Sequence, residues 1–347
     1  MRPTPFGKAL SISSRCVSHF DWSAIRRAMS TKKSPSSTAD ARPLALIAGP
    51  TASGKSANAL DLAQKLEKSG RTGVIINADS MQVYADIPIL SAAPSEEERE
   101  VCEHRLYGAW DGADACSAAD WAARAKAEIE KCHANDLVPI LVGGTGMYLK
   151  VLLEGIAPIP EIEPEVREVV RAMETQTAYA ALQIEDPVRA AELEPGDSQR
   201  IARALEVKRS TGVTLGDWQQ AKTGGIGDEV ALTAIVMMPE RQWVYDRCDA
   251  RFAAMVEGGA VEEVEALLAR DLSPELPVMR AIGVPEIAAL IRGEATKDEA
   301  IEAGAQSTRQ YAKRQFTWLR NQCPEDWKRI ESQNIDVEAL FAGLFQT

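Results

Sequence analysis

One octapeptide, residues 49–56, constrains the fold of this chain more than any other feature of the sequence. It reads Gly-Pro-Thr-Ala-Ser-Gly-Lys-Ser and matches the pattern G-x-x-x-x-G-K-[ST] in full. Residues 44–48 before it are apolar and predict a buried strand, and an apolar-periodic helix follows it to about Gly70. A strand, a glycine-rich loop and a helix in this order predict a phosphate-binding loop, in which backbone N–H groups and the helix N-terminus face an anion.

The residues of this loop have separate predicted roles. Lys55 is expected to reach the terminal phosphate, and the hydroxyl of Ser56 is expected to ligate Mg²⁺. The motif predicts a polyphosphate or pyrophosphate ligand without saying which one. A switch GTPase is not expected, because the sequence has neither N-K-x-D nor an apolar strand ending in D-x-x-G. The residues expected to hold the ligand are Gly49, Pro50, Thr51, Ala52, Ser53, Gly54, Lys55 and Ser56.

Strand and helix patterns alternate around the loop. Residues 74–77 and 137–142 predict two further strands with a helix between them, which indicates a parallel sheet with helices on its faces. A proline-rich segment then leads to a helical pattern from residue 164 to about 211, and strand character returns at residues 232–237. We predict an α/β fold with a P-loop NTPase-like parallel sheet flanked by helices and an all-helical insertion domain. The expected division is a leader (1–42), a core (43–156 and 226–325), a helical insertion (157–225) and a C-terminal tail (326–347).

Charge is unevenly distributed along the chain. The total is −12, which argues against a generic nucleic-acid binder but allows a local basic groove. Residues 1–42 carry eight basic and two acidic residues, so they hold +6 and the remainder holds −18. This leader is expected to be disordered or the product of an upstream start codon, with a mitochondrial transit peptide as the alternative. The six cysteines lack zinc or disulfide spacing, and no apolar run reaches the ~20 residues of a membrane helix.

Asp79 ends the second predicted strand. In a parallel sheet the carboxyl ends of the strands face the ligand crevice, so this side chain is expected to point toward the loop. A carboxylate there can bind Mg²⁺ or act as a general base on a nucleophile. It can also simply cap a turn, because Asp-Ser is common turn chemistry.

Several segments together resemble the tRNA dimethylallyltransferase family, over roughly residues 43–322. The loop alone is shared with many families, but its combination with D-S-M-Q-V-Y, G-G-T-x-x-Y and K-R-Q-x-T-W is specific. The matching segments besides the loop are residues 79–84, 142–148, 199–207, 246–252 and 308–320.

The resemblance implies an activity and a set of site residues. It implies transfer of a dimethylallyl group from dimethylallyl pyrophosphate to the exocyclic N6 amine of adenosine 37 in tRNA, with release of pyrophosphate. The implied catalytic residues are Asp79 as general base, with Thr145, Arg247 and Lys55 on the pyrophosphate, and Mg²⁺ on Ser56. Arg309, Lys313 and Arg314 are expected to share one helix face. The implied tRNA contacts are Asp79, Ser80, Met81, Gln82, Thr145, Arg167, Gln199, Arg200, Ile201, Ala202, Arg203, Arg280, Gly283, Arg309, Lys313 and Arg314.

Two segments depart from the family pattern. Residues 90–94 read Leu-Ser-Ala-Ala-Pro where the family usually has Gly-Thr-Ala-Lys-Pro, and residues 283–286 read Gly-Val-Pro-Glu in place of Gly-Tyr-Lys/Arg-Glu. The absence of a C-terminal zinc finger favours a bacterial-type enzyme.

The expected partners are tRNA, through its anticodon loop, and dimethylallyl pyrophosphate. No membrane is expected. The chain is expected to act as a monomer in the cytoplasm, or in mitochondria if the leader is a transit peptide. The alternatives are a P-loop small-molecule kinase, an adenylate isopentenyltransferase and a non-catalytic RNA- or nucleotide-binding module.

Overall fold

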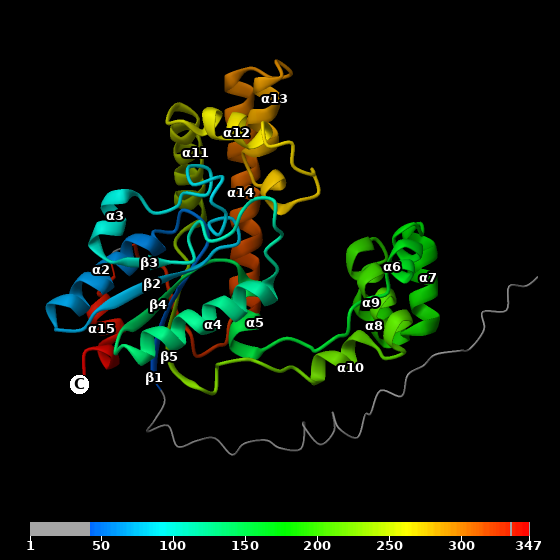
Figure 1. Ribbon diagram of the computed structural model, residues 1–347, viewed down its shortest axis with the longest axis horizontal. Helices are drawn as coiled ribbons and strands as arrows, with labels where there is room; N and C mark the ends of the chain where they lie inside the picture. Colours follow the sequence, from blue (N-terminus) through cyan, green and yellow to red (C-terminus); the bar gives the residue numbers. More distant parts are fainter. Residues whose placement is uncertain (1–41, 334, 347) are drawn as a thin grey trace, which may run out of the picture. The chain divides into compact units, whose positions relative to one another are not determined.

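The computed structural model describes residues 42–333 and 335–346, and a sheet of six parallel strands lies at its centre (Figure 1). All neighbouring strands pair in parallel. The strands, in their order across the sheet, are β3 (Glu103–Arg105), β2 (Gly73–Ala78), β4 (Val138–Gly143), β1 (Arg42–Ala48), β5 (Val230–Met237) and β6 (Lys328–Ile330). This order confirms the predicted parallel sheet and puts the loop after β1 near its middle. The predicted leader lies outside the described residues, except for Arg42.

Both faces of the sheet are covered, which explains why its inner strands are continuously apolar. Every residue of β2 and β4 is buried. On one face α2 (Lys55–Lys68) and the short α15 (Val337–Leu340) form a core that includes Leu62 and Val337. On the other face α4 (Ala118–Ala134) and α5 (Gly146–Glu154) contribute Trp121 and Tyr148, whose rings stack with centroids 4.5 Å apart.

Five helices between β4 and β5 form a group of their own, as the helical pattern of the sequence predicts. The first four of them in chain order share a core that is separate from the two cores of the sheet and includes Val170, Leu182 and Leu205. The helices are α6 (Pro164–Arg171), α7 (Thr175–Glu185), α8 (Pro187–Glu192), α9 (Ser198–Thr211) and α10 (Leu215–Gln220). An insertion that folds by itself needs a core of its own.

The segment after β5 contains the longest helix, α14 (Lys297–Gln322). It packs along α11 (Arg241–Glu257) and also reaches α5, where Trp318 lies so close to Gly146 that a Cβ there would be 2.2 Å from the indole ring. Between α11 and α14 lie α12 (Ala260–Leu268), a 3₁₀ turn at Pro277–Arg280 and α13 (Val284–Ile291). In the part of the chain that the structure describes, no helix has the length and apolar character needed to cross a membrane.

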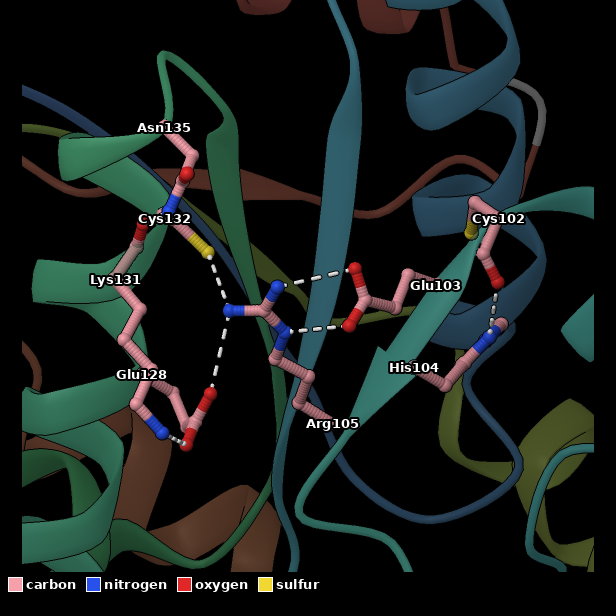
Figure 2. Close-up of polar contacts among 8 residues, drawn as sticks. All are labelled: Cys102, Glu103, His104, Arg105, Glu128, Lys131, Cys132 and Asn135. Carbon is pink, nitrogen blue, oxygen red and sulfur yellow. Dashed lines mark hydrogen bonds and ion pairs between the residues drawn. The ribbon is translucent and has the colours of Figure 1, made fainter.

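The two edge strands were not predicted from the sequence. β3 has only three residues and is fixed by the guanidinium of Arg105, which contacts Glu103 over 2.9 Å and Glu128 of α4 over 3.2 Å (Figure 2). At the other edge, β6 pairs with β5, so residues 326–347 are not merely the tail that we expected. Short charged strands are common at sheet edges and carry no apolar pattern, which is why the sequence did not reveal them.

Candidate active site

The loop of residues 49–56 joins β1 to α2, as predicted. Its backbone reverses at Ala52 and Gly54, whose φ angles are 61° and 89°, and α2 begins directly after Gly54. The N–H of Gly49 donates to the carbonyl of Gly143 over 3.1 Å, which fixes the start of the loop against the end of β4. The observed conformation is that of a loop built to surround an anion.

Lys55 turns back over this loop. Its Nζ donates to the carbonyl of Pro50 over 3.1 Å. The pKa of Lys55 is lowered to about 8, mainly by burial and in part by the nearby charge of Arg251, whereas the charge of Asp79 opposes the shift. The ammonium is therefore poorly stabilised by the protein alone, and an anion bound in the loop would favour its protonated form.

Asp79 lies directly after β2 in a turn that Asn77 holds. The side-chain oxygen of Asn77 accepts from the N–H of Asp79 over 2.8 Å, and its amide nitrogen donates to the Asp79 carbonyl over 3.0 Å. The Oδ1 of Asp79 accepts from the N–H of Met81 over 2.9 Å. The carboxylate thus caps the turn, as one interpretation of the sequence proposed, and it also lines the cavities described next.

Two cavities meet at Asp79. The first, of about 320 Å³, lies over the loop and is lined by Lys55, Ser56 and the segment of residues 91–94. The second, of about 250 Å³, has a partly apolar lining that includes Leu90 and Phe252. The residues that line both cavities are Thr51, Asp79, Ser91 and Arg251. A group bound over the loop and a group bound in the second cavity would therefore meet beside the Asp79 carboxylate.

Two arginines of α11 approach the loop. The Nε of Arg247 donates to the carbonyl of Ala52 over 3.0 Å, and its guanidinium lies 4.7 Å from the centre of the Trp243 ring. Arg251, one helical turn later, donates to the hydroxyl of Thr51, and burial lowers its pKa. Of these two arginines, only Arg247 was predicted from the sequence to contact the pyrophosphate. The i, i+4 spacing in the matched segment was the signal that could have pointed to Arg251 as well.

Thr145 follows β4 and contacts the turn of Asp79. Its hydroxyl oxygen accepts from the N–H of Ser80 over 2.9 Å and lies 3.3 Å from the Ser80 hydroxyl. Tyr311 of α14 lines the second cavity together with Ser80, and burial together with the charge of Asp79 raises its pKa. The predicted contact of Thr145 with a phosphate stays a prediction, because Thr145 is not among the residues that line either cavity. Tyr311 was missed, although it lies inside a matched segment.

The three predicted cations of α14 do not act as one group. Arg314 lines the second cavity, and together with Lys313 it also lines a groove with Arg200 and Trp318. Arg309 instead pairs with Asp249 over 2.6 Å and with Glu302 over 3.0 Å. The expectation of one shared face is therefore wrong for the set as a whole: Arg309 and Lys313 are about 40° apart around the helix, whereas Arg314 is about 140° from Arg309.

Two other predicted tRNA contacts have internal partners. The side-chain amide of Gln82 donates to the carbonyls of Ser91 and Ala92, over 3.0 and 2.7 Å, and so holds the segment that covers the loop. Gly283 is buried with φ of 100°, and a Cβ there would lie 2.5 Å from Leu90. The glycine therefore makes room for Leu90, the residue found where the family usually has glycine.

The remaining predicted contacts differ in exposure. The structure buries Ile201 completely in the core of the helical group, so its side chain does not reach the surface. Arg280 lines the second cavity and pairs with Glu275. Met81 lines the same cavity, and Ala202 and Arg203 are half-buried. The exposed members of the predicted set are Arg167, Gln199, Arg200, Arg280, Lys313 and Arg314.

Comparison with known proteins assigns the chain to a family. The IPP transferase family matches residues 82–322. A tRNA dimethylallyltransferase of Erythrobacter litoralis is 59% identical over 314 residues, which cover 90% of this chain and 99% of the relative. A tRNA isopentenylpyrophosphate transferase of Bacillus halodurans has a similar structure, with a TM-score of 0.62, 29% identity and coverage of 88% of this chain and 97% of that one. A eukaryotic dimethylallyltransferase acting on tRNA has a TM-score of 0.68, 27% identity and coverage of 80% and 70%. The chain therefore belongs to the IPP transferase family.

Proposed function

We infer that this chain is a transferase that moves a dimethylallyl group from dimethylallyl pyrophosphate to an adenosine in tRNA. The observation that carries this function is the meeting of two cavities at Asp79, one over a phosphate-binding loop and one with a partly apolar lining. The names of its relatives agree, since the Erythrobacter litoralis relative is a tRNA dimethylallyltransferase and the eukaryotic structure acts on tRNA. The target that we propose is the N6 amine of adenosine 37.

The proposed reaction is a single displacement. The N6 nitrogen of the adenosine attacks the first carbon of the dimethylallyl group, the bond from that carbon to the pyrophosphate oxygen breaks, and pyrophosphate leaves. The proton lost by the amine passes to the carboxylate of Asp79. A general base is needed because the lone pair of this amine is delocalised into the adenine ring, which makes it a weak nucleophile.

The leaving group lies on the loop in this proposal. Lys55 and the loop backbone bind its phosphates, and charge that develops on the departing pyrophosphate is stabilised by fixed positive groups. Arg251 is placed to do this because it lines both cavities and contacts Thr51 in the loop. Arg247 acts at the rim of the first cavity, where it also holds the carbonyl of Ala52.

Prenyl transfer from a pyrophosphate generally uses a divalent metal ion. We propose that the ion is Mg²⁺, held by the Ser56 hydroxyl and by phosphate oxygens of the substrate. The donors fit this ion, because Ser56 and Asp79 both line the first cavity and offer the oxygen ligands that Mg²⁺ prefers. When bound, Mg²⁺ would neutralise charge on the pyrophosphate.

The tRNA approaches from the side of the second cavity in this proposal. Arg280 and Arg314 line that cavity, and Lys313 and Arg200 line the groove beside it. These cations would contact phosphates while the target base, turned out of its stack, enters the second cavity. We propose that the chain acts as a monomer.

A labelling experiment tests this function. The purified protein is incubated with radiolabelled dimethylallyl pyrophosphate, Mg²⁺ and either unmodified tRNA or AMP. We expect label in tRNA only. Label in AMP would make the chain an adenylate isopentenyltransferase, and absence of transfer together with ATP consumption in the presence of small-molecule acceptors would indicate a kinase.

A further inference from the structure

Gln315 lies in the middle of α14 with 4% of its surface exposed, and its side chain contacts two loops of the site. Its Oε1 accepts from the backbone N–H of Thr51 over 2.7 Å. Its Nε2 donates to the carbonyl of Gly144 over 3.2 Å. Both ends of one buried amide are therefore satisfied by backbone groups, one in the phosphate-binding loop and one at the end of β4.

The packing around this amide is tight. A Cβ at Gly144 would lie 2.5 Å from the Nε2 of Gln315 and 2.4 Å from the carbonyl oxygen of Gly49. The start of the loop, the end of β4 and α14 therefore converge on one point that only glycine can occupy. A displacement of Gln315 would be passed directly to both loops, because close-packed groups have no free space in which to absorb it.

Such a displacement would be passed to the reacting groups through Thr51. The N–H of Thr51 donates to Gln315. It therefore does not face the anion, although the general loop pattern predicts that it would. Its side chain accepts from Arg251, and Thr51 lines both cavities. One turn earlier on α14, Tyr311 lines the second cavity together with Asp79 and Ser80. The same stretch of α14 thus contacts the pyrophosphate side and the acceptor side of the site.

We propose that Gln315 is a positioning residue for the transfer reaction: it fixes the loop that holds the leaving group against Gly144, the neighbour of Thr145, which in turn contacts the turn of the general base. This inference rests on the proposed function, because it needs a pyrophosphate on the loop and an acceptor beside Asp79. Gln315 itself lines neither cavity. Its removal should therefore slow the bond-forming step at saturating substrate while the affinities for both substrates change little.

Two substitutions test this role. Gln315→Met keeps the length of the side chain and removes both hydrogen bonds, whereas Gln315→Glu keeps an acceptor for the N–H of Thr51 and removes the donor to Gly144. Gln306→Met is the matched control, because Gln306 is an exposed glutamine of the same helix. Single-turnover transfer from labelled dimethylallyl pyrophosphate to tRNA is measured, since it excludes product release. KM values for both substrates and thermal melting are measured alongside.

A displacement of reacting groups by about 1 Å can cost on the order of 10²-fold in rate. We therefore expect the single-turnover rate to fall by about 10- to 100-fold in both Gln315 variants, with KM values within about threefold of wild type. Unchanged rates in a folded Gln315→Glu variant would overturn the inference, as would losses confined to KM. If Gln315→Met does not fold, Gln315→Glu decides alone. If neither folds, Gln315 is a residue of the core rather than a positioning residue, and the inference fails. Absence of transfer to tRNA by the wild-type protein would instead refute the proposed function.

Discussion

The hydroxyl oxygen of Thr145 accepts a hydrogen bond of 2.9 Å from the backbone N–H of Ser80, so the end of β4 is joined to the turn that carries Asp79. The two strands involved, β2 and β4, are neighbours in the sheet. Because Ser80 directly follows Asp79, this bond restricts where the carboxylate can lie. Thr145 can therefore influence the reaction without touching a phosphate.

Replacement of Thr145 by valine should show this influence. Valine has nearly the same shape but no acceptor, so the N–H of Ser80 loses its partner at a cost of about 1–3 kcal/mol if no water replaces it. We expect Thr145→Val to lower the transfer rate by at least about tenfold through misplacement of Asp79. Thr145→Ser keeps the hydroxyl and should retain most of the activity. Equal activity of the valine and serine variants, measured as kcat on tRNA, would show that this hydrogen bond is unimportant.

Asp79→Asn should remove the general base and preserve the turn. The asparagine oxygen can still accept from the N–H of Met81, which the Asp79 carboxylate now does over 2.9 Å. We expect the single-turnover rate to fall by about 10²–10⁴-fold, the usual contribution of a general base. Pyrophosphate affinity, measured by calorimetry, should be retained, because the substitution removes a negative charge that repels the bound anion. A rate close to wild type would exclude Asp79 as the base.

The sequence revealed the elements with long apolar patterns and the site residues that neighbour them. The loop, its flanking strand and helix, and Asp79 at the end of β2 could be located because parallel strands bring their carboxyl ends together. The edge strands β3 and β6 could not, since three charged or mixed residues have no period.

Residues whose role depends on distant packing were also missed. Thr51 and Gln315 are 264 positions apart, and only the docking of α14 on the loop brings them into contact. The same docking explains Tyr311, and the packing of α11 explains Arg251. The opposite error concerns Arg309, which matched a family motif but is paired with Asp249. A motif shows which residues recur, whereas their partners follow from the fold.

Affinity for dimethylallyl pyrophosphate should decrease at alkaline pH because of Lys55. Burial lowers the pKa of this ammonium to about 8 in the free protein, and a bound pyrophosphate favours the charged form and so raises that pKa. Affinity is therefore full below about pH 8 and should weaken by up to tenfold per pH unit above it, until the pKa of the complex is reached. Calorimetric titration without tRNA measures this directly, because no transfer occurs. A constant affinity between about pH 7 and pH 9 would contradict the assignment.

Asp79→Asn gives an internal control for that pH dependence. The negative charge of Asp79 raises the pKa of Lys55 and partly offsets the effect of burial. Without this charge, the loss of affinity should begin at a lower pH than in the wild-type protein. A break at the same pH would mean that a group other than Lys55 controls binding.

Salt dependence of tRNA binding should separate the cations of α14. Lys313 and Arg314 line the groove, whereas Arg309 is held by Asp249 and Glu302. If each of the first two contacts one phosphate of a single-stranded loop, the double variant Lys313→Gln/Arg314→Gln should reduce the slope of log affinity against log salt by about 1.4. Arg309→Gln is the matched control and should leave the slope unchanged, while it lowers stability by at most about 1 kcal/mol, as expected for surface ion pairs. A slope reduced by Arg309→Gln, with no effect of the double variant, would move the tRNA-contacting surface to the Arg309 side of α14.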